Sequence, residues 1–348
     1  MNKTTWIEIE PVDTLFFRGA ESMEAGENHE VDTMFPPMPA TITGAIRTAI
    51  LRQQGIAPAD YLKGPDRYRQ KYPLLGTPQE PGFTLLGPLF MVGDGILLLP
   101  APAHWYADLP DSTKMQWGEK KYTVQAAAPL AARMNGLAGS VSQPFWVHQP
   151  EGSDMKSLNG YWGTKEAFAV MHQGDGKIVF CNSFDKLQAG EAAILACNSL
   201  FDREERVGIA LTPQRTAIEG HLYSAVHIRL RDGVRLVAGI SSSHQTPMES
   251  EGILQLGGEQ RVCRYRLLPE LDLPKNPKGN MLLAISPLEI SQLPQELASC
   301  PRASGKLLRI GGWDMEKRFH KPMSAWLPAG TVIAVTNTTN NPPQCLTI

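Results

Sequence analysis

The chain has 348 residues, which is enough for two domains of ordinary size or for one large one. Hydrophobic residues make up 42% of it and charged residues 20%, a balance that permits a packed core and excludes a mainly disordered chain. The formal net charge is only -2, which argues against a free-standing nucleic-acid binder, because phosphate contacts need Lys and Arg. A nucleic-acid-binding function stays open if the basic residues are grouped on one surface, or if partner chains supply the positive charge.

The five cysteines are odd in number and include no CxxC pair, so we expect reduced thiols rather than a disulfide framework or a zinc site. The first residues, MNKTTWIEIEP, lack the apolar stretch of a signal peptide. No apolar run approaches the ~20 residues that span a bilayer. We therefore expect a soluble, cytoplasmic protein without membrane contacts.

Residues 5–17 begin as a strand in which Ile7 and Ile9 face a core, while Trp6, Glu8 and Glu10 point the other way. The pattern then predicts a helix that is capped by Thr41 and closed by Gly55, with apolar residues at helical spacing.

Gly44 lowers the stability of this helix by roughly 1 kcal/mol relative to Ala. We therefore expect another backbone segment to pass close to it, which only glycine would allow. Residues 83–99 predict a hairpin that turns at Gly93-Asp94-Gly95.

Residues 100–200 give little signal beyond a helix near 190–201. Residues 222–240 predict two strands around Arg231-Asp232-Gly233. Further strands are predicted at 260–268, 280–286, 306–312 and 329–335. This order of elements favours an α+β fold of two units, each a sheet with helices on one face.

The common catalytic motifs are absent from the sequence: it has no phosphate-binding loop, dinucleotide-binding GxGxxG, HExxH or GxSxG. Ser241-Ser242-Ser243-His244 is better interpreted as a polar turn after a strand than as a nucleophile with its base. His29 and His320 are candidate general bases for RNA cleavage, which keeps an enzyme open as an alternative.

The first basic cluster, residues 206–235, contains five arginines and no lysine: Arg206, Arg215, Arg229, Arg231 and Arg235. The planar guanidinium binds phosphate through two parallel hydrogen bonds and stacks on bases. An equally good interpretation is ion pairing with the acidic residues Glu204, Glu205, Glu219 and Asp232.

The second cluster is LGGEQRVCRYR, residues 256–266. Its paired glycines expose backbone amides and let a polymer approach closely. In the strand that follows, Arg264 and Arg266 share one face, and Arg261 and Tyr265 share the other. The pattern suits a single-stranded RNA backbone with one stacked base, although glycine pairs are more often simple tight turns.

The third cluster, residues 306–322, carries five basic residues against two acidic ones, with a predicted Gly-Gly turn followed by Trp313. A solvated loop explains this segment better than RNA binding does when the segment is taken alone. Two Gly-Gly pairs beside Arg and an aromatic residue strengthen the RNA interpretation jointly.

Five segments, in this order, resemble one family. They are PVDTLFFRG (11–19), PPMPATITGAIRTAIL (36–51), ERVGIALTPQRTAIEGHLYSAVHIRL (205–230), LGGEQR (256–261) and GGWDMEKRFHKPMSAWLPAGTV (311–332). The chain resembles the family of third subunits of the Cmr complex, the type III-B CRISPR effector, within the repeat-associated mysterious protein (RAMP) superfamily. It departs from many relatives at Gly19, where they carry an acidic residue.

The resemblance implies two ferredoxin-like (RRM-like) domains packed together, with glycine-rich loops on one face. The domains would be 1–204, with an insertion around 100–200 that carries a thumb-like hairpin, and 205–348. It also implies a non-catalytic RNA-binding subunit without cofactor or metal. That subunit would anchor the 5′ tag of the CRISPR RNA beside the large polymerase-cyclase subunit and the backbone RAMP subunits.

The alternatives are a metal-independent RAMP endoribonuclease that processes precursor CRISPR RNA, and a bridge that touches protein only. The resemblance also implies which residues of this chain bind RNA. They are Arg18, Arg47, Arg206, Arg215, His221, Tyr223, Gly257, Gly258, Arg261, Gly311, Gly312, Lys317 and Lys321.

Overall fold

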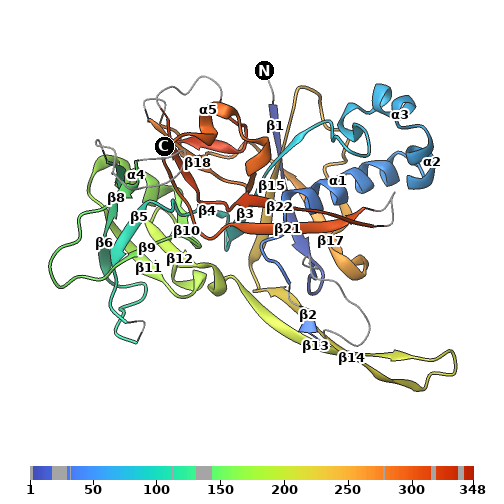
Figure 1. Cartoon of the computed structure of the whole chain (residues 1–348), viewed down its shortest axis with the longest axis horizontal. Helices are drawn as coiled ribbons and strands as arrows, with labels where there is room; N and C mark the ends of the chain where they lie inside the picture. Colours follow the sequence, from blue (N-terminus) through green and yellow to red (C-terminus); the bar gives the residue numbers. More distant parts are fainter. Residues whose placement is uncertain are drawn as a thin grey trace. The chain divides into compact units, whose positions relative to one another are not determined.

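The computed structural model describes residues 3–17, 30–31, 33–111, 113–130, 143–276, 279–314, 319–335 and 341–348. The chain forms two compact units, each built from three separate segments (Figure 1). Unit 1 comprises Met1–Pro88, Phe201–Glu270 and Arg309–Ser324. Unit 2 comprises Leu89–Leu200, Leu271–Leu308 and Ala325–Ile348. Within the described part, no helix is long and apolar enough to cross a membrane.

The first strand of the chain lies inside the main sheet of unit 1. β1 (Lys3–Pro11) pairs antiparallel with β15 (Val234–Ser242) on one side and with β17 (Val262–Leu268) on the other. β16 (Glu251–Gln255) pairs with β17, and β15 lies beside β3 (Thr84–Val92), a strand that begins in unit 1. The resulting strand order is β16-β17-β1-β15-β3.

β1 is buried on both faces. Ile7 and Ile9 are fully buried, as predicted. The prediction that the opposite face points away from a core is wrong for Trp6 and Glu8, which are buried as well, and is confirmed for Glu10, which is exposed. The Glu8 carboxylate lies 3.0 Å from the guanidinium of Arg266, which compensates part of the cost of burying a charge.

Unit 1 contains three consecutive helices: α1 (Pro39–Gln53), α2 (Pro58–Lys63) and α3 (Pro65–Lys71). The predicted helix is confirmed as α1, but Thr41 is not its cap. The helix begins earlier, after Met38, because the fixed φ and missing N–H of Pro39 suit a first helical position. Gly55 ends it with φ +66°, as predicted.

A long hairpin in unit 1 consists of β13 (Phe201–Leu211) and β14 (Ala217–Leu230) and extends away from the rest of that unit (Figure 1). β2 (Glu30–Val31) pairs parallel with β14. The strands predicted around residues 231–233 are confirmed, yet they belong to different sheets. A thumb-like hairpin was expected within 100–200, whereas the longest hairpin of the described residues directly follows that stretch.

The main sheet of unit 2 has the strand order β4-β10-β12-β11-β6-β5-β9. These strands are β4 (Ile96–Pro100), β10 (Tyr161–Thr164), β12 (Ala193–Ala196), β11 (Lys177–Cys181), β6 (Lys121–Ala126), β5 (Trp105–Asp108) and β9 (Met155–Ser157). The helix α4 (Lys165–Gln173) follows β10 directly. The prediction of a helix near 190–201 is wrong, because Ala193–Ala196 is a strand buried between two others.

A second sheet of unit 2 has the order β20-β23-β18-β24 and packs on a small apolar core with α5 (Gln295–Ala298). Its strands are β20 (Arg302–Ala303), β23 (Val332–Ala334), β18 (Met281–Ala284) and β24 (Cys345–Thr347). The remaining strands are β7 (Ala128–Pro129), β8 (Phe145–Trp146), β19 (Leu288–Glu289), β21 (Leu308–Asp314) and β22 (Phe319–Leu327).

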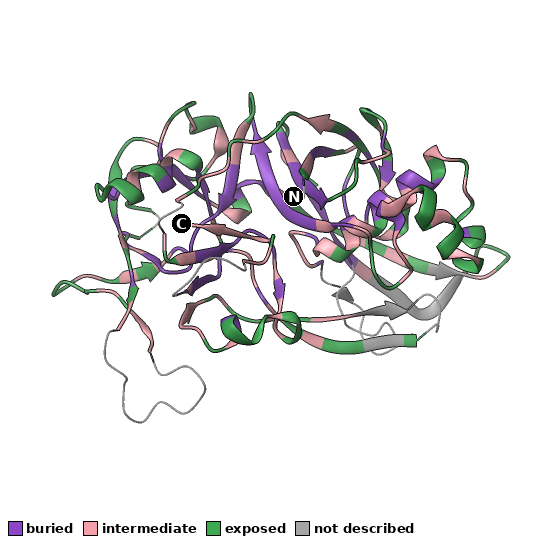
Figure 2. Cartoon of the chain, turned by 90° about the horizontal axis from the view of Figure 1, so that it is seen from above, coloured by how far each residue is buried: buried purple, intermediate pink, exposed green. Residues whose placement is uncertain are grey.

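The α+β class is confirmed, with sheets dominating and few helices in the described residues. Figure 2 shows the buried residues concentrated on the strands and on one side of α1. The predicted hairpin at 83–99 is confirmed by the pairing of β3 with β4. The predicted strands at 260–268, 280–286, 306–312 and 329–335 are confirmed as β17, β18, β21 and β23. The domain division at 204/205 stays a prediction.

Candidate nucleic-acid interface

The glycine pair of the second basic cluster joins β16 to β17 in unit 1. The Gly258 N–H donates a hydrogen bond of 2.7 Å to the carbonyl of Phe16. A Cβ atom on Gly257, whose φ is +86°, would lie 2.4 Å from that same carbonyl oxygen. The close approach that these glycines permit is therefore made by the chain's own Phe16 segment, and the Gly258 amide is already used.

Two further residues of this loop have left-handed backbones although they are not glycine. Glu259 and Gln260 each have φ +52°. Such conformations cost free energy and persist where the surrounding structure enforces them, which occurs often at binding sites.

A groove of about 330 Å³ lies between this loop and α1. On the helix it is lined by Thr41, Gly44, Ala45 and Thr48, and on the other side by Phe17, Gln255, Gly257 and Gly258. The helix residues follow the spacing i, i+3, i+4, i+7 of one helix face. Small residues on the helix wall, and the two glycines on the opposite wall, leave room for a polymer backbone.

Gly44 faces this open space. Among the described residues, no atom lies within 4 Å of the position that a Cβ would take. The expectation of a close backbone approach at Gly44 is therefore wrong: the residue widens the groove. Arg52, one turn beyond the groove on α1, donates a 2.6 Å hydrogen bond to Gln255 in the opposite wall.

A network of ion pairs in unit 1 joins three arginines to three carboxylates. Asp13 lies 3.6 Å from Arg206, 3.0 Å from Arg229 and 3.1 Å from Arg261. Glu204 also pairs with Arg206 and Arg229, and Glu259 pairs with Arg261. Of the two interpretations left open for the first cluster, ion pairing with Glu204 is observed, and the network adds Asp13, which lies far away in the sequence.

The network holds two of its carboxylates, Asp13 and Glu204, ionised. Burial alone would raise the pKa of Asp13, but the Thr14 backbone N–H and the neighbouring Arg229 and Arg206 outweigh it and lower that pKa. Hydrogen bonds from Arg229 hold the pKa of Glu204 below its usual value. Partly exposed arginines that are held in place by carboxylates can exchange those partners for phosphate.

A buried histidine connects the ion-pair network to the glycine-rich loop, residues 256–261. His227 stacks on Phe16, with ring centroids 5.1 Å apart, and its Nδ1 lies 3.1 Å from Thr14 Oγ1. Its Nε2 lies 3.9 Å from Glu259. Burial lowers the pKa of His227, so its ring is neutral near pH 7. His227 lies within the segment 205–230 that carries the family resemblance, but no pattern in the sequence marks it individually as a site residue.

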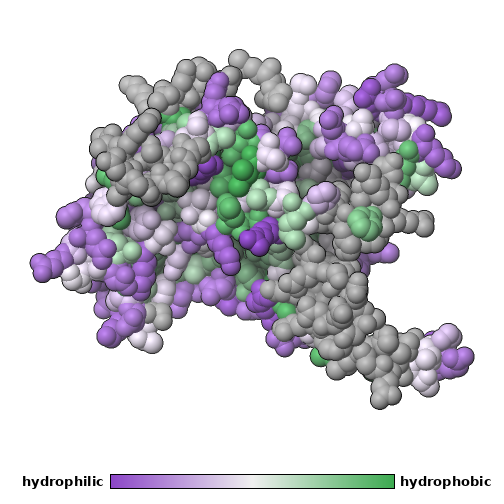
Figure 3. Space-filling view, viewed as in Figure 1, coloured by the Kyte–Doolittle hydropathy of each residue, from purple (hydrophilic) through white to green (hydrophobic). Residues whose placement is uncertain are grey.

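Several predicted residues lie elsewhere in unit 1. Arg47 donates hydrogen bonds to the Tyr61 hydroxyl and to the carbonyls of Thr77 and Pro78, so it braces the chain that follows α3. Arg215 is exposed at the turn of the β13–β14 hairpin, with φ +61°. Figure 3 shows that this turn is hydrophilic.

Tyr265 does not offer its ring to a base. Its side chain is buried, and its hydroxyl hydrogen-bonds with Gln53 and donates to the carbonyl of Glu249. Arg264 and Arg266 are exposed on the opposite face of β17, as predicted.

The third cluster differs from its prediction. Gly311 and Gly312 lie within β21, so they do not form a turn. The strand continues to Asp314 because it pairs with β22 in a sheet.

The remaining predicted residues are only partly described. Arg18, His29 and Lys317 lie outside the described residues. The backbones of His221 and Tyr223 belong to β14, and those of His320 and Lys321 to β22, but their side chains lie outside the described part. The described residues contain no group of three or more His, Cys, Asp or Glu that could hold a metal ion.

Two solved structures share this fold. Both are cryo-EM structures of the type III-B Cmr-beta complex, one bound to cognate target RNA and one to cognate target RNA and AMPPnP. The TM-scores are 0.53 and 0.52 respectively, each at 15% identity, with 94% of this chain and 86% of the other chain covered. A search of curated protein sequences found no match.

The sequence profile of one family, described as "CRISPR-associated protein (Cas_Cmr3)", matches residues 7–277. The match begins in β1 and includes α1, the hairpin β13–β14 and the glycine-rich loop, so it contains every element of the groove. The chain therefore belongs to the Cas_Cmr3 family of CRISPR-associated proteins.

Proposed function

We propose that the chain is a non-catalytic RNA-binding subunit of a type III-B CRISPR effector complex, and that it anchors the 5′ tag of the CRISPR RNA. The groove between α1 and the glycine-rich loop is the observation that carries this proposal. It is narrow, lined by small residues and backbone, and bordered by Arg52. Membership of the Cas_Cmr3 family supplies the biological setting.

The groove suits a backbone more than a base. Thr41, Thr48 and Gln255 offer hydroxyl and amide groups to sugar or phosphate, while the Tyr265 ring does not line the groove and cannot stack on a base there. An RNA strand that is bound through its sugar-phosphate backbone is held in position without recognition of its bases. This mode of binding suits a 5′ tag of constant sequence.

The ion-pair network supports the same proposal. Three arginines and three carboxylates cancel in charge, which accords with the near-neutral composition of the chain. A phosphate that displaces Asp13 would meet arginines already held extended, so little side-chain entropy would be lost on binding.

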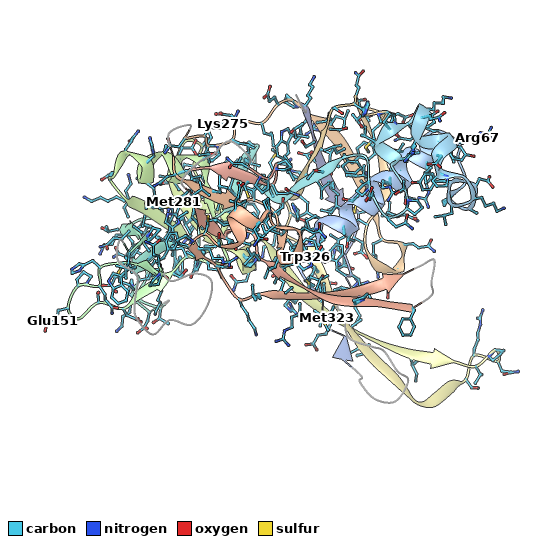
Figure 4. All side chains as sticks on the ribbon, turned by 45° about the horizontal axis from the view of Figure 1, so that its top comes forward. Arg67, Glu151, Lys275, Met281, Met323 and Trp326 are labelled. Atoms are coloured by element: carbon cyan, nitrogen blue, oxygen red, sulfur yellow. The ribbon has the colours of Figure 1, made fainter. Side chains whose placement is uncertain are left out.

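Exposed apolar side chains support contacts with partner subunits. Val207 and Ile209 stand on β13, and Phe319 and Met323 stand on β22; Met323 is labelled in Figure 4. Large apolar residues gathered on exposed strands mark protein interfaces. We assign these surfaces to the large polymerase-cyclase subunit and the backbone RAMP subunits.

The proposal extends to the fold of unit 1. Its strands β17-β1-β15-β3 follow the order fourth, first, third, second along the chain, with α1 between the first and second. This strand order supports a ferredoxin-like sheet in unit 1. In the sequence, β16 occupies the place between the third and fourth strands where such a fold would have its second helix.

The test is to fill the groove at Gly44. Gly44→Trp should place a large side chain in open space without disturbing the core, and Gly44→Ala is the matched control that adds only a methyl group. In the assembled complex, we expect Gly44→Trp to weaken protection of the 5′ tag from nuclease at least about tenfold, while Gly44→Ala protects it as wild type does.

Full tag protection by a folded Gly44→Trp variant would exclude the groove as the RNA site. The same preparation should be mixed with precursor repeat RNA in the absence of metal. A discrete cleavage product that disappears in His29→Ala or His320→Ala would replace the proposed function with the processing endoribonuclease.

A further inference from the structure

Unit 2 contains a larger pocket, of about 780 Å³, formed by α4, the start of β5 and the segment that leads into β18. This volume lies in the range of pockets that hold nucleotide- or drug-sized ligands. Trp105 and Phe168 form an apolar wall, with ring centroids 4.9 Å apart. Met171 and Met281 are half-buried in the lining, and their flexible thioethers adapt well to flat aromatic rings.

His104 is the unusual member of the lining. The residue is only 4% exposed, and its Nδ1 has no hydrogen-bond partner among the described residues. A buried polar atom without a partner destabilises the fold, so it requires an explanation. Burial lowers the pKa of His104 to about 4, so the ring is neutral near pH 7 and offers one donor and one acceptor.

The rest of the lining adds amides and charged groups, which include Glu166, Lys275 and the ion pair of Lys165 with Asp272 at 2.7 Å. Gln173, Asn276 and Asn280 carry side-chain amides, which both donate and accept. Lys275 is exposed at the pocket and forms no ion pair with the described residues. Figure 4 labels Lys275 and Met281, which belong to the same bordering segment.

We propose that this pocket binds a nucleobase, either that of a free mononucleotide or that of one unpaired RNA nucleotide. The apolar wall and the methionines would contact the faces of the ring. The His104 imidazole and the amides would bond to its edge, and Lys275 would contact the phosphate. The pocket lies within unit 2 and shares no residue with the groove of unit 1, so the two sites can be tested separately.

A peptide from a partner subunit would need a different lining. An extended peptide presents a row of backbone groups and is usually held along a strand edge or in a groove. Here the lining combines an aromatic wall with an imidazole and side-chain amides, which suits the faces and the edge of a planar ring.

The experiment uses the full-length protein and two probes: AMP, GMP, CMP and UMP singly, and a single-stranded RNA of ten nucleotides. His104→Phe keeps a flat ring but removes both nitrogens, and Ala169→Trp narrows the mouth of the pocket from an exposed position on α4. His148→Phe is the matched control, since His148 is exposed and does not line the pocket. Binding is measured by calorimetry, and Gly44→Trp is included to remove groove binding.

We expect at least one mononucleotide to bind, and both pocket variants to weaken it about tenfold or more, with no effect of His148→Phe or Gly44→Trp. Competition between that mononucleotide and the RNA would identify an RNA base as the occupant, and saturation by the mononucleotide alone would identify a free nucleotide. Binding that survives in both variants would overturn the proposal. So would a photocross-linker at position 169 that captures a protein subunit and no RNA in the assembled complex.

Discussion

The groove of unit 1 and the pocket of unit 2 are built on opposite principles. The groove exists because side chains are missing: Gly44 leaves space, and Gly257 and Gly258 let the chain pass close to Phe16. The pocket exists because large side chains such as Trp105 and Phe168 form its wall around a buried imidazole. A site made from glycine and charge leaves a mark in the sequence, whereas a site made from core residues does not.

The two regions also differ in how their polar groups are satisfied. Asp13 and its arginines are partly exposed and compensate one another, so the network can change partners at little cost. His104 is buried and uncompensated by the described residues. The first arrangement favours reversible exchange with a polyanion, and the second favours a ligand that completes the site.

The largest expected effect is on the backbone of the glycine loop. Gly257→Val would place Cβ 2.4 Å from the Phe16 carbonyl oxygen, at a φ of +86° that β-branched residues avoid. We expect the free energy of unfolding to fall by about 3–5 kcal/mol, measured by urea denaturation. Gly44→Val is the control, and it should leave the free energy of unfolding unchanged or raise it by about 0.5 kcal/mol or less, because valine favours a helix more than glycine does. If the two variants are equally stable, then the fold does not require glycine at position 257 any more than it does at position 44.

A smaller effect is expected on the pH dependence of stability. His104 has a pKa of about 4 when folded and an ordinary value of about 6.5 when unfolded, so the unfolded state binds more protons between these values. The stability that depends on a neutral His104 is therefore present above about pH 6.5 and is lost as the pH falls toward 4, by roughly 3 kcal/mol in total.

Chemical denaturation at a series of pH values measures this loss. His104→Phe should flatten the curve in this window and leave the protein at least as stable at pH 7, because no polar atom stays unpartnered. If the free energy of unfolding depends on pH in the same way in the variant and in the wild type, then groups other than His104 cause the loss of stability at acid pH.

The smallest effect concerns the charge network. Asp13→Asn removes the carboxylate that Arg206, Arg229 and Arg261 share, so these side chains become available to phosphate. We expect RNA affinity at low salt to rise about threefold to tenfold, with a steeper dependence on salt. Asp154→Asn, which breaks the exposed pair with Lys156 in unit 2 and lies outside both the groove and the pocket, is the control and should leave affinity unchanged. Lower affinity in Asp13→Asn would mean that the carboxylates position the arginines and do not compete with RNA.

Local patterns in the sequence predicted most elements. Helical spacing predicted α1, and alternation of apolar residues predicted the strands at 260–268 and 329–335. Errors arose where the cause was distant: both faces of β1 are covered because strands from residues 234–268 flank it. The run at 190–201 has helical composition, yet sheet neighbours on both sides make it a strand.

The candidate site was predicted in part. The sequence marked Gly257, Gly258 and Arg261, but it could not show that Phe16 requires the glycines or that Asp13 pairs with the arginine, because these contacts span more than 200 residues. His104 gave no motif. Its only signal is an isolated histidine in the otherwise apolar run APAHWYA, which indicates burial and not a role.

The central place of β1 has a consequence for synthesis on the ribosome. β1 is made first, but its neighbours β15 and β17 end at Ser242 and Leu268. At about 5–20 residues per second, the nascent strand waits roughly 13–50 s with both of its edges unpaired. An apolar strand in that state pairs readily with another chain. Translation speed and chaperone supply should therefore govern the yield of this protein, and an N-terminal fragment should aggregate where the full chain folds.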